Sequence, residues 1–179
     1  MTGPARTASF TCSVCGRNHQ GAPLSWGPDA PDAWAALASG ERESRGECGT
    51  DQCVIDEKHF FIRGRIEIPV TDTGETFAWL VWVRVSAPDF FRMSDMWTVD
   101  GREMSPPYSA ALANLLPLYS EPTLGLSVRL HTRPVGVRPF VEILGDHSLR
   151  GQQRNGISSH EVQAIADKFL KLPLDESQR

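Results

Sequence analysis

The residues in this sequence best suited to chemistry are its four cysteines. They occur as Cys12-x2-Cys15 and, after 32 intervening residues, as Cys48-x4-Cys53. Zinc takes four nitrogen or sulfur ligands at the corners of a tetrahedron, and a Cys-x2-Cys turn supplies two of them from one short segment. Gly16 follows the first pair and lets the backbone bend so that its amides reach the thiolates. We therefore predict one Zn²⁺ bound by Cys12, Cys15, Cys48 and Cys53.

Four cysteine ligands close the coordination shell and leave no position for a water molecule, so the predicted zinc is structural. His19 could replace one of the second pair as a ligand. A thiol redox pair of Cys12 and Cys15 is the other common use of this motif. Such a pair usually opens a helix within a βαβ unit, and no such pattern surrounds Cys12. The pattern favours zinc.

A second group of candidate residues is cationic. On the predicted strands these side chains share one polar face with Glu67 and Glu142, and they could bind a carboxylate, a phosphate or an acidic partner. The alternative is a solvated face over which the arginine stems lie. The group consists of Arg63, Arg65, Arg129, His131 and Arg133.

Period-2 alternation indicates the strands that would position these residues. It runs from Phe60 to Val70, and after a Thr-Asp-Thr-Gly-Glu turn a second apolar segment predicts a strand over residues 76–86. The second of these strands is apolar on both faces, which is typical of a central strand covered on both sides. Two further strands are predicted over residues 124–133 and 137–144.

Capping residues indicate the helices. Ser86 and Asp89, and Ser158 and Glu161, form capping boxes for helices over residues 86–97 and 158–173. A short helix capped by Asp29 or Asp32 carries residues 34–40, and another is predicted over residues 111–116. Residues 41–51 are charged and contain glycine, so we predict a loop there.

These elements predict an α+β fold, an antiparallel sheet of about four or five strands with helices packed on it. The metal-binding segment precedes the sheet. We expect residues 1–53 to form an N-terminal zinc-knuckle segment with a short helix. Residues 54–173 then form the α+β body of one compact domain, and residues 174–179 form a tail.

Composition excludes several classes of partner. The chain of 179 residues has a net charge of −4, which gives no reason to expect nucleic acid or an anionic membrane as a partner. No apolar run approaches the roughly 18 residues of a membrane helix, and the N-terminus lacks the apolar stretch of a secretory signal. We predict a cytoplasmic protein, in which free thiols are more common than disulfides.

Six sequence blocks together carry a family resemblance. They are CSVCGRNH, DQCVID, HFFIRGRIEIPV, FAWLVWV, RPFVEI and HSLRGQQRNGIS, in this order from about Thr11 to Leu170. The chain resembles a bacterial family known as domain of unknown function 2199, which has no established activity. The resemblance implies that Cys12, Cys15, His19 and Cys53 match residues characteristic of the family. It also implies that most members have an apolar residue where this chain has Cys48. The resemblance thus offers His19 or Asp51 as an alternative fourth ligand.

We predict a small zinc-binding protein whose metal is structural and whose body binds a small molecule or another protein. The alternative is a metal-dependent enzyme. In that case Cys12, Cys15 and Cys53 leave a water-bearing position on zinc, and His19, Asp51 or Asp56 act as acid or base. The number of protein ligands on the metal distinguishes the two.

Overall fold

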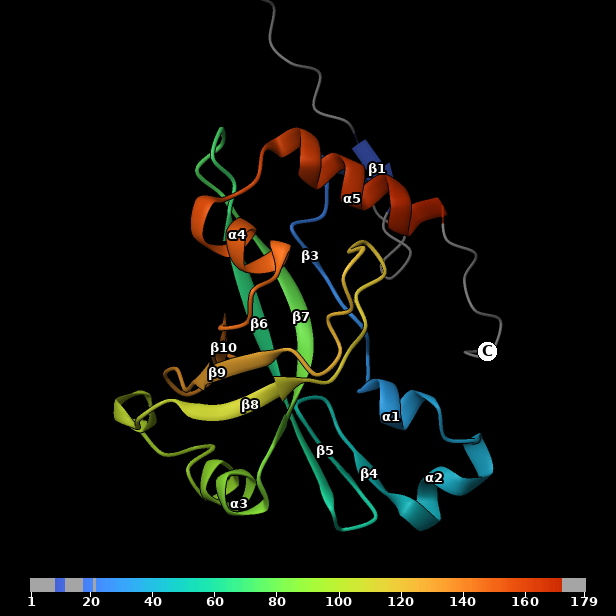
Figure 1. Cartoon of the computed structure of the whole chain (residues 1–179), viewed down its shortest axis with the longest axis vertical. Helices are drawn as coiled ribbons and strands as arrows, with labels where there is room; N and C mark the ends of the chain where they lie inside the picture. Colours follow the sequence, from blue (N-terminus) through green and yellow to red (C-terminus); the bar gives the residue numbers. More distant parts are fainter. Residues whose placement is uncertain (1–8, 12–17, 21, 172–179) are drawn as a thin grey trace, which may run out of the picture.

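The computed structural model of the chain describes residues 9–11, 18–20 and 22–171. Its centre is a pair of long antiparallel strands, β6 (His59–Pro69) and β7 (Thr76–Val85), which run diagonally through the molecule in Figure 1. Their register extends from Phe60 opposite Val85 to Pro69 opposite Thr76. The two strands predicted from period-2 alternation are therefore confirmed.

The sheet around these strands closes into a five-stranded barrel. From β7 it continues antiparallel through β8 (Tyr108–Leu112), β9 (Ser127–His131) and β10 (Phe140–Ile143). It returns to β6 by a parallel pairing of Phe140 with Arg65. The α+β class is confirmed, but the predicted simple antiparallel sheet is wrong, because β10 pairs with β6 rather than forming an edge.

Gly64 makes this closure possible. It lies on β6 where the strand passes β10, and a Cβ atom at this position would lie 2.7 Å from Cγ2 of Val141 and 3.1 Å from the carbonyl oxygen of Pro139. Real Cβ atoms do not approach other atoms so closely, so any larger residue would push β10 away.

Five further strands lie outside the barrel. The hairpin of β4 (Gly46–Cys48) and β5 (Gln52–Ile55) extends the sheet beside β6, and β3 (Ser25–Trp26) pairs with β7 in parallel. Strands β1 (Ser9–Thr11) and β2 (Asn18–Gln20) form a separate two-stranded sheet. In Figure 1, β1 is drawn beside the C-terminal helix α5 (Ser159–Lys171), at the end of the molecule opposite the β4–β5 hairpin.

The helices cover the outside of this sheet. They are α1 (Asp32–Ala35), α2 (Ser39–Arg45), α3 (Ala87–Asp95), α4 (Ser148–Asn155) and α5, with a 3₁₀ turn, η1 (Arg102–Met104), after α3. The capping box at Ser158 is confirmed, because Ser158 accepts the N–H of Glu161 at 3.2 Å and the Glu161 carboxylate accepts the N–H of Ser158 at 2.8 Å. At α3, Ser86 is the N-cap and accepts the N–H of Asp89 at 3.2 Å, but its hydroxyl, not its N–H, donates to the Asp89 carboxylate, so only half of that box forms. None of these helices, within the described residues, has the length and apolar character needed to cross a membrane.

Three local predictions are wrong. The short helix expected to carry residues 34–40 under a cap of Asp29 or Asp32 is α1 at Asp32–Ala35, with Pro31 at its N-cap and no side-chain cap. The helix predicted over residues 111–116 is instead the end of β8 and an irregular segment. Alanine and leucine favour helix, but here they lie on a strand fixed by its neighbours β7 and β9. The loop predicted over residues 41–51 contains most of α2 and the whole of β4.

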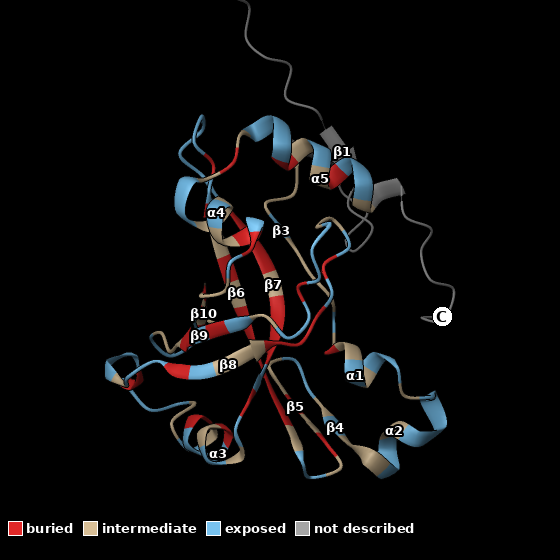
Figure 2. Cartoon of the chain, viewed as in Figure 1, coloured by how far each residue is buried: buried red, intermediate tan, exposed pale blue. Residues whose placement is uncertain are grey.

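The two faces of β6 and β7 bury separate apolar clusters. The larger lies inside the barrel and under α3, α4 and α5, and Figure 2 shows buried residues along both long strands. The smaller lies on the opposite face, where α1 covers the sheet. It consists of Cys53, Ile55, Phe61, Trp82 and Ala113, with Trp34, Leu37 and Cys48 packed against it.

Candidate functional site

Two of the four predicted zinc ligands lie side by side. Cys48 on β4 is directly opposite Cys53 on β5. The neighbouring pair is hydrogen bonded, from the N–H of Gly49 to the carbonyl of Gln52 at 2.8 Å. Hydrogen-bonded and non-hydrogen-bonded pairs alternate in an antiparallel ladder, so the two cysteines occupy a non-hydrogen-bonded position, where side chains are closest. Both side chains point to the same face of the hairpin.

The two thiols differ in their exposure. Cys53 is fully buried in the smaller apolar cluster, whereas Cys48 is half-buried at its edge, and neither forms a disulfide. The pair therefore has one thiol that solvent can reach and one that it cannot.

The surroundings favour a thiolate on Cys48. Its pKa is lowered, first by the hydrogen bond from the Cys53 thiol and then by the charges of Arg63 and Arg42, while burial acts in the opposite direction. The pKa of Cys53 is raised, first by the same hydrogen bond and then by burial. Within the pair, Cys48 is therefore the thiol whose deprotonated form the surroundings favour.

Arg63 is the buried cation of this site. Its side chain donates to the carbonyl of Pro28 at 3.0 Å, lies 3.8 Å from the carboxylate of Asp29 and covers the ring of Trp82. Its Nε has no acceptor among the described residues. Burial is the main reason that the pKa of Arg63 is lowered, and the charge of Cys48 partly offsets this.

The carboxylates near the cysteines are held by arginines. Asp56 accepts from Nε and Nη2 of Arg45 at 2.9 and 2.6 Å, and this lowers the pKa of Asp56. Asp51 accepts from Nε of Arg138 at 2.5 Å. Both acids, which the enzyme hypothesis would use for proton transfer, are therefore committed to ion pairs.

A cleft of about 550 Å³ lies between the β4–β5 hairpin and α3. Gln52 and Ser94 join its two walls, because the hydroxyl of Ser94 donates to the amide oxygen of Gln52 at 3.3 Å. One wall is polar and the other is aromatic. The lining residues are Glu47, Gly49, Thr50, Asp51, Gln52, Val54, Phe90, Ser94 and Trp97.

Most of the predicted cationic group lies on the outer surface of the barrel. Arg65, Phe140 and His131 are in register across β6, β10 and β9, and Arg129 is opposite Glu142, so these side chains share the outward face. Arg63 belongs to the same face of β6 but is covered near α1.

Acidic residues neutralise much of this surface. Arg133 donates to both oxygens of Glu67 at 2.8 and 2.7 Å, which lowers the pKa of Glu67. His131 contacts Glu142 at 2.9 Å. In the described part of the chain, Arg129 is the member without an ion pair. Anion or partner binding by this group stays a prediction.

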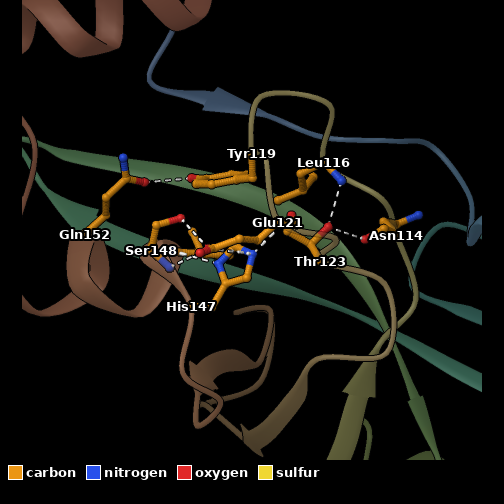
Figure 3. Close-up of polar contacts among 9 residues, drawn as sticks. Asn114, Leu116, Tyr119, Glu121, Thr123, His147, Ser148 and Gln152 are labelled. Carbon is orange, nitrogen blue, oxygen red and sulfur yellow. Dashed lines mark hydrogen bonds and ion pairs between the residues drawn. The ribbon is translucent and has the colours of Figure 1, made fainter.

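A second polar cluster joins α4 to the loop that follows β8 (Figure 3). Nδ1 of His147 accepts the N–H of Leu149 at 3.0 Å, so the ring caps α4 and its Nε2 donates to the carbonyl of Glu121. The N–H and hydroxyl of Ser148 bind the Glu121 carboxylate, which lowers the pKa of Glu121. These hydrogen bonds cap the start of α4 and hold the loop at Glu121 against it, so this cluster has a structural role.

The remaining predicted ligands are placed less fully. Cys12 and Cys15 lie outside the described residues, and His19 lies on β2 opposite Phe10. No group of three or more His, Cys, Asp or Glu side chains within residues 9–11, 18–20 and 22–171 is placed to hold a metal ion. The four-cysteine site stays a prediction. Sequence reasoning joined Cys48 and Cys53 only through a shared zinc and missed the hairpin that places them opposite each other. Nothing local in the sequence indicated Arg42 or Arg63 as their neighbours.

Comparison with known proteins gives a family but no activity. The family described as "Uncharacterized protein conserved in bacteria" (DUF2199) matches residues 11–157. The chain therefore belongs to this family, which confirms the resemblance seen in the sequence. No curated protein and no solved structure matches the chain.

Proposed function

We propose that this protein binds one structural zinc ion through cysteine thiolates and that its α+β body binds another molecule. The observation that carries the zinc proposal is the Cys48–Cys53 pair, two cysteines directly opposite each other on one face of a hairpin. In a tetrahedral site with Zn–S bonds of about 2.3 Å, neighbouring sulfurs lie about 3.8 Å apart, which is close to the contact distance of two thiols. The pair thus fits half of a zinc shell.

The contacts favour Cys48 over Asp51 as a ligand. The Asp51 carboxylate is bound to Arg138, so zinc would have to break that ion pair. Arg63 and Arg42 instead stabilise the thiolate form of Cys48, which is the form that binds metal. We therefore assign Cys48, and not Asp51, as the ligand that this hairpin contributes beside Cys53.

The other two ligands in this proposal are Cys12 and Cys15. A single shell would therefore join the N-terminal segment to the β4–β5 hairpin through the metal. Such coupling of metal binding to folding is common, because zinc sites are rarely preformed.

A structural role fits the surroundings better than catalysis. The enzyme alternative needs a free carboxylate beside an open zinc position, and arginines Arg138 and Arg45 already bind the carboxylates of Asp51 and Asp56. The apolar cluster around Cys53 also gives a substrate no path to that sulfur. The cleft between the hairpin and α3 is the place where the body would bind a small polar molecule or a peptide.

The zinc proposal is tested by elemental analysis of the untagged chain. We expect about one zinc per chain, lost in C48S, C53S and C12S and retained in H19A. Thr50→Ala, an exposed change in the same hairpin, is the matched control and retains zinc. A chain without zinc, or retention of zinc by C48S, would contradict the four-cysteine proposal. Loss of zinc in H19A with retention in C48S would favour the histidine-completed site.

A further inference from the structure

The register of the β4–β5 hairpin places Cys48 and Cys53 at a position suited to a covalent bond. At a non-hydrogen-bonded antiparallel pair the Cα atoms lie about 4.5 Å apart. A disulfide spans Cα separations of about 4.4–6.8 Å. We propose that Cys48 and Cys53 form a reversible disulfide, which makes this hairpin a thiol–disulfide modification site.

The burial of the two thiols assigns their roles. Cys48 is half-buried and lies at the edge of the smaller apolar cluster, where a small oxidant can reach it. Cys53 is fully buried within that cluster. Cys48 is the attacking thiol and Cys53 resolves the intermediate.

The oxidant is a low-molecular-weight disulfide, RSSR. The Cys48 thiolate attacks one sulfur of RSSR, a new S–S bond joins Cys48 to RS, and one RS⁻ leaves and takes up a proton. Cys53 then loses its proton and attacks the Cys48 sulfur, and the second RS⁻ leaves. The protein dithiol loses two electrons and two protons, and RSSR is reduced to two RSH molecules.

The bond would act on two neighbouring features. It would hold β4 against β5, and residues of this hairpin form the polar wall of the cleft beside α3. It would also withdraw two thiolates from zinc, since a disulfide sulfur is not a thiolate ligand. The second consequence rests on the proposed zinc function, whereas formation of the disulfide does not.

The geometry assigns redox chemistry to a different pair from the one that the sequence motif indicates. Cys12-x2-Cys15 has the familiar redox spacing, but its residues lie outside the described part of the chain. Four residues separate Cys48 from Cys53, and strand pairing brings the two cysteines together. The two pairs can be separated experimentally because each can be removed without the other.

The full-length chain is stripped of metal with a chelator and equilibrated in glutathione buffers of increasing oxidised fraction. Free thiols are then blocked with iodoacetamide, and the peptides are mapped by mass spectrometry. We expect a Cys48–Cys53 linkage in the wild type and in C12S/C15S, which dithiothreitol reverses. C53S should instead accumulate glutathione on Cys48. The proposal is overturned if Cys48 and Cys53 are both recovered as alkylated free thiols from the most oxidising buffer. It is also overturned if the only linkage found joins Cys12 to Cys15.

Circular dichroism of each variant checks that the fold is retained, and zinc content is measured on the same preparations. A disulfide in a chain that never binds zinc would support this inference and contradict the proposed zinc function. Bound zinc without a Cys48–Cys53 disulfide in the stripped chain would support the zinc function and overturn this inference.

Discussion

The side-chain oxygen of Asn114 accepts the backbone N–H of Trp82 at 2.7 Å. Asn114 is fully buried, and its amide nitrogen donates to the carbonyl of Ala30 at 3.0 Å and to the carboxylate of Asp32 at 2.9 Å. One side chain therefore continues the hydrogen-bond ladder beyond the end of β8 and attaches the α1 segment to the barrel. Since α1 covers the cluster that contains Cys53, Asn114 indirectly supports the thiol pair.

We expect Asn114→Ala to lower the free energy of unfolding by about 2–3 kcal/mol, because it leaves the buried N–H of Trp82 without an acceptor. Urea denaturation followed by tryptophan fluorescence measures the change. Ser109→Ala, at an exposed position on β8, is the control and should change stability by less than about 0.5 kcal/mol. Equal stability of the two variants would show that Asn114 does not anchor α1.

Gly64→Ala tests the closure of the barrel. The added methyl group would meet Val141 and Pro139 on β10, so we expect a loss of about 1–3 kcal/mol in thermal or urea unfolding. Gly40→Ala, on exposed α2 with no atom within 4 Å of the new Cβ, should be neutral or stabilising by up to about 1 kcal/mol. A Gly64→Ala protein as stable as the wild type would argue against the contact between β6 and β10.

The Glu67–Arg133 ion pair makes stability depend on pH. Arg133 lowers the pKa of Glu67 in the folded state, so the pair contributes stability above the unfolded pKa of about 4.3 and loses it as the pH falls through the lower folded value. Glu67→Gln should cost about 1 kcal/mol at pH 7, after allowance for partial solvent exposure, and less at pH 3. Unfolding curves at both pH values measure this. A cost that is unchanged or larger at pH 3 would contradict the assignment.

Local sequence patterns were sufficient for the long elements. Alternating apolar residues identified β6 and β7, and Ser86 and Ser158 marked the starts of α3 and α5. Barrel closure could not be predicted in this way, because it depends on the pairing of Phe140 with Arg65, far apart in the sequence. Composition misled at β8, where neighbouring strands overrode the helix preference of an alanine- and leucine-rich segment.

The sequence predicted the kind of chemistry at the candidate site better than it predicted the arrangement of its residues. Four cysteines indicated thiol or metal chemistry, and the structure places Cys48 opposite Cys53. The exposure of one thiol, the burial of the other and the approach of Arg63 depend on how α1 and the hairpin pack. Hydrophobic periodicity does not indicate which side chains meet in the fold. The arginine partners of Asp51 and Asp56 therefore could not be predicted from the sequence.

The most direct test of the zinc account is X-ray absorption spectroscopy at the zinc edge on the zinc-loaded full-length chain. The account predicts four sulfur scatterers at about 2.3 Å, which is the shell expected for Cys12, Cys15, Cys48 and Cys53. A shell with three or fewer sulfurs completed by nitrogen or oxygen at about 2.0 Å would contradict the closed four-cysteine site and favour an open or histidine-completed one.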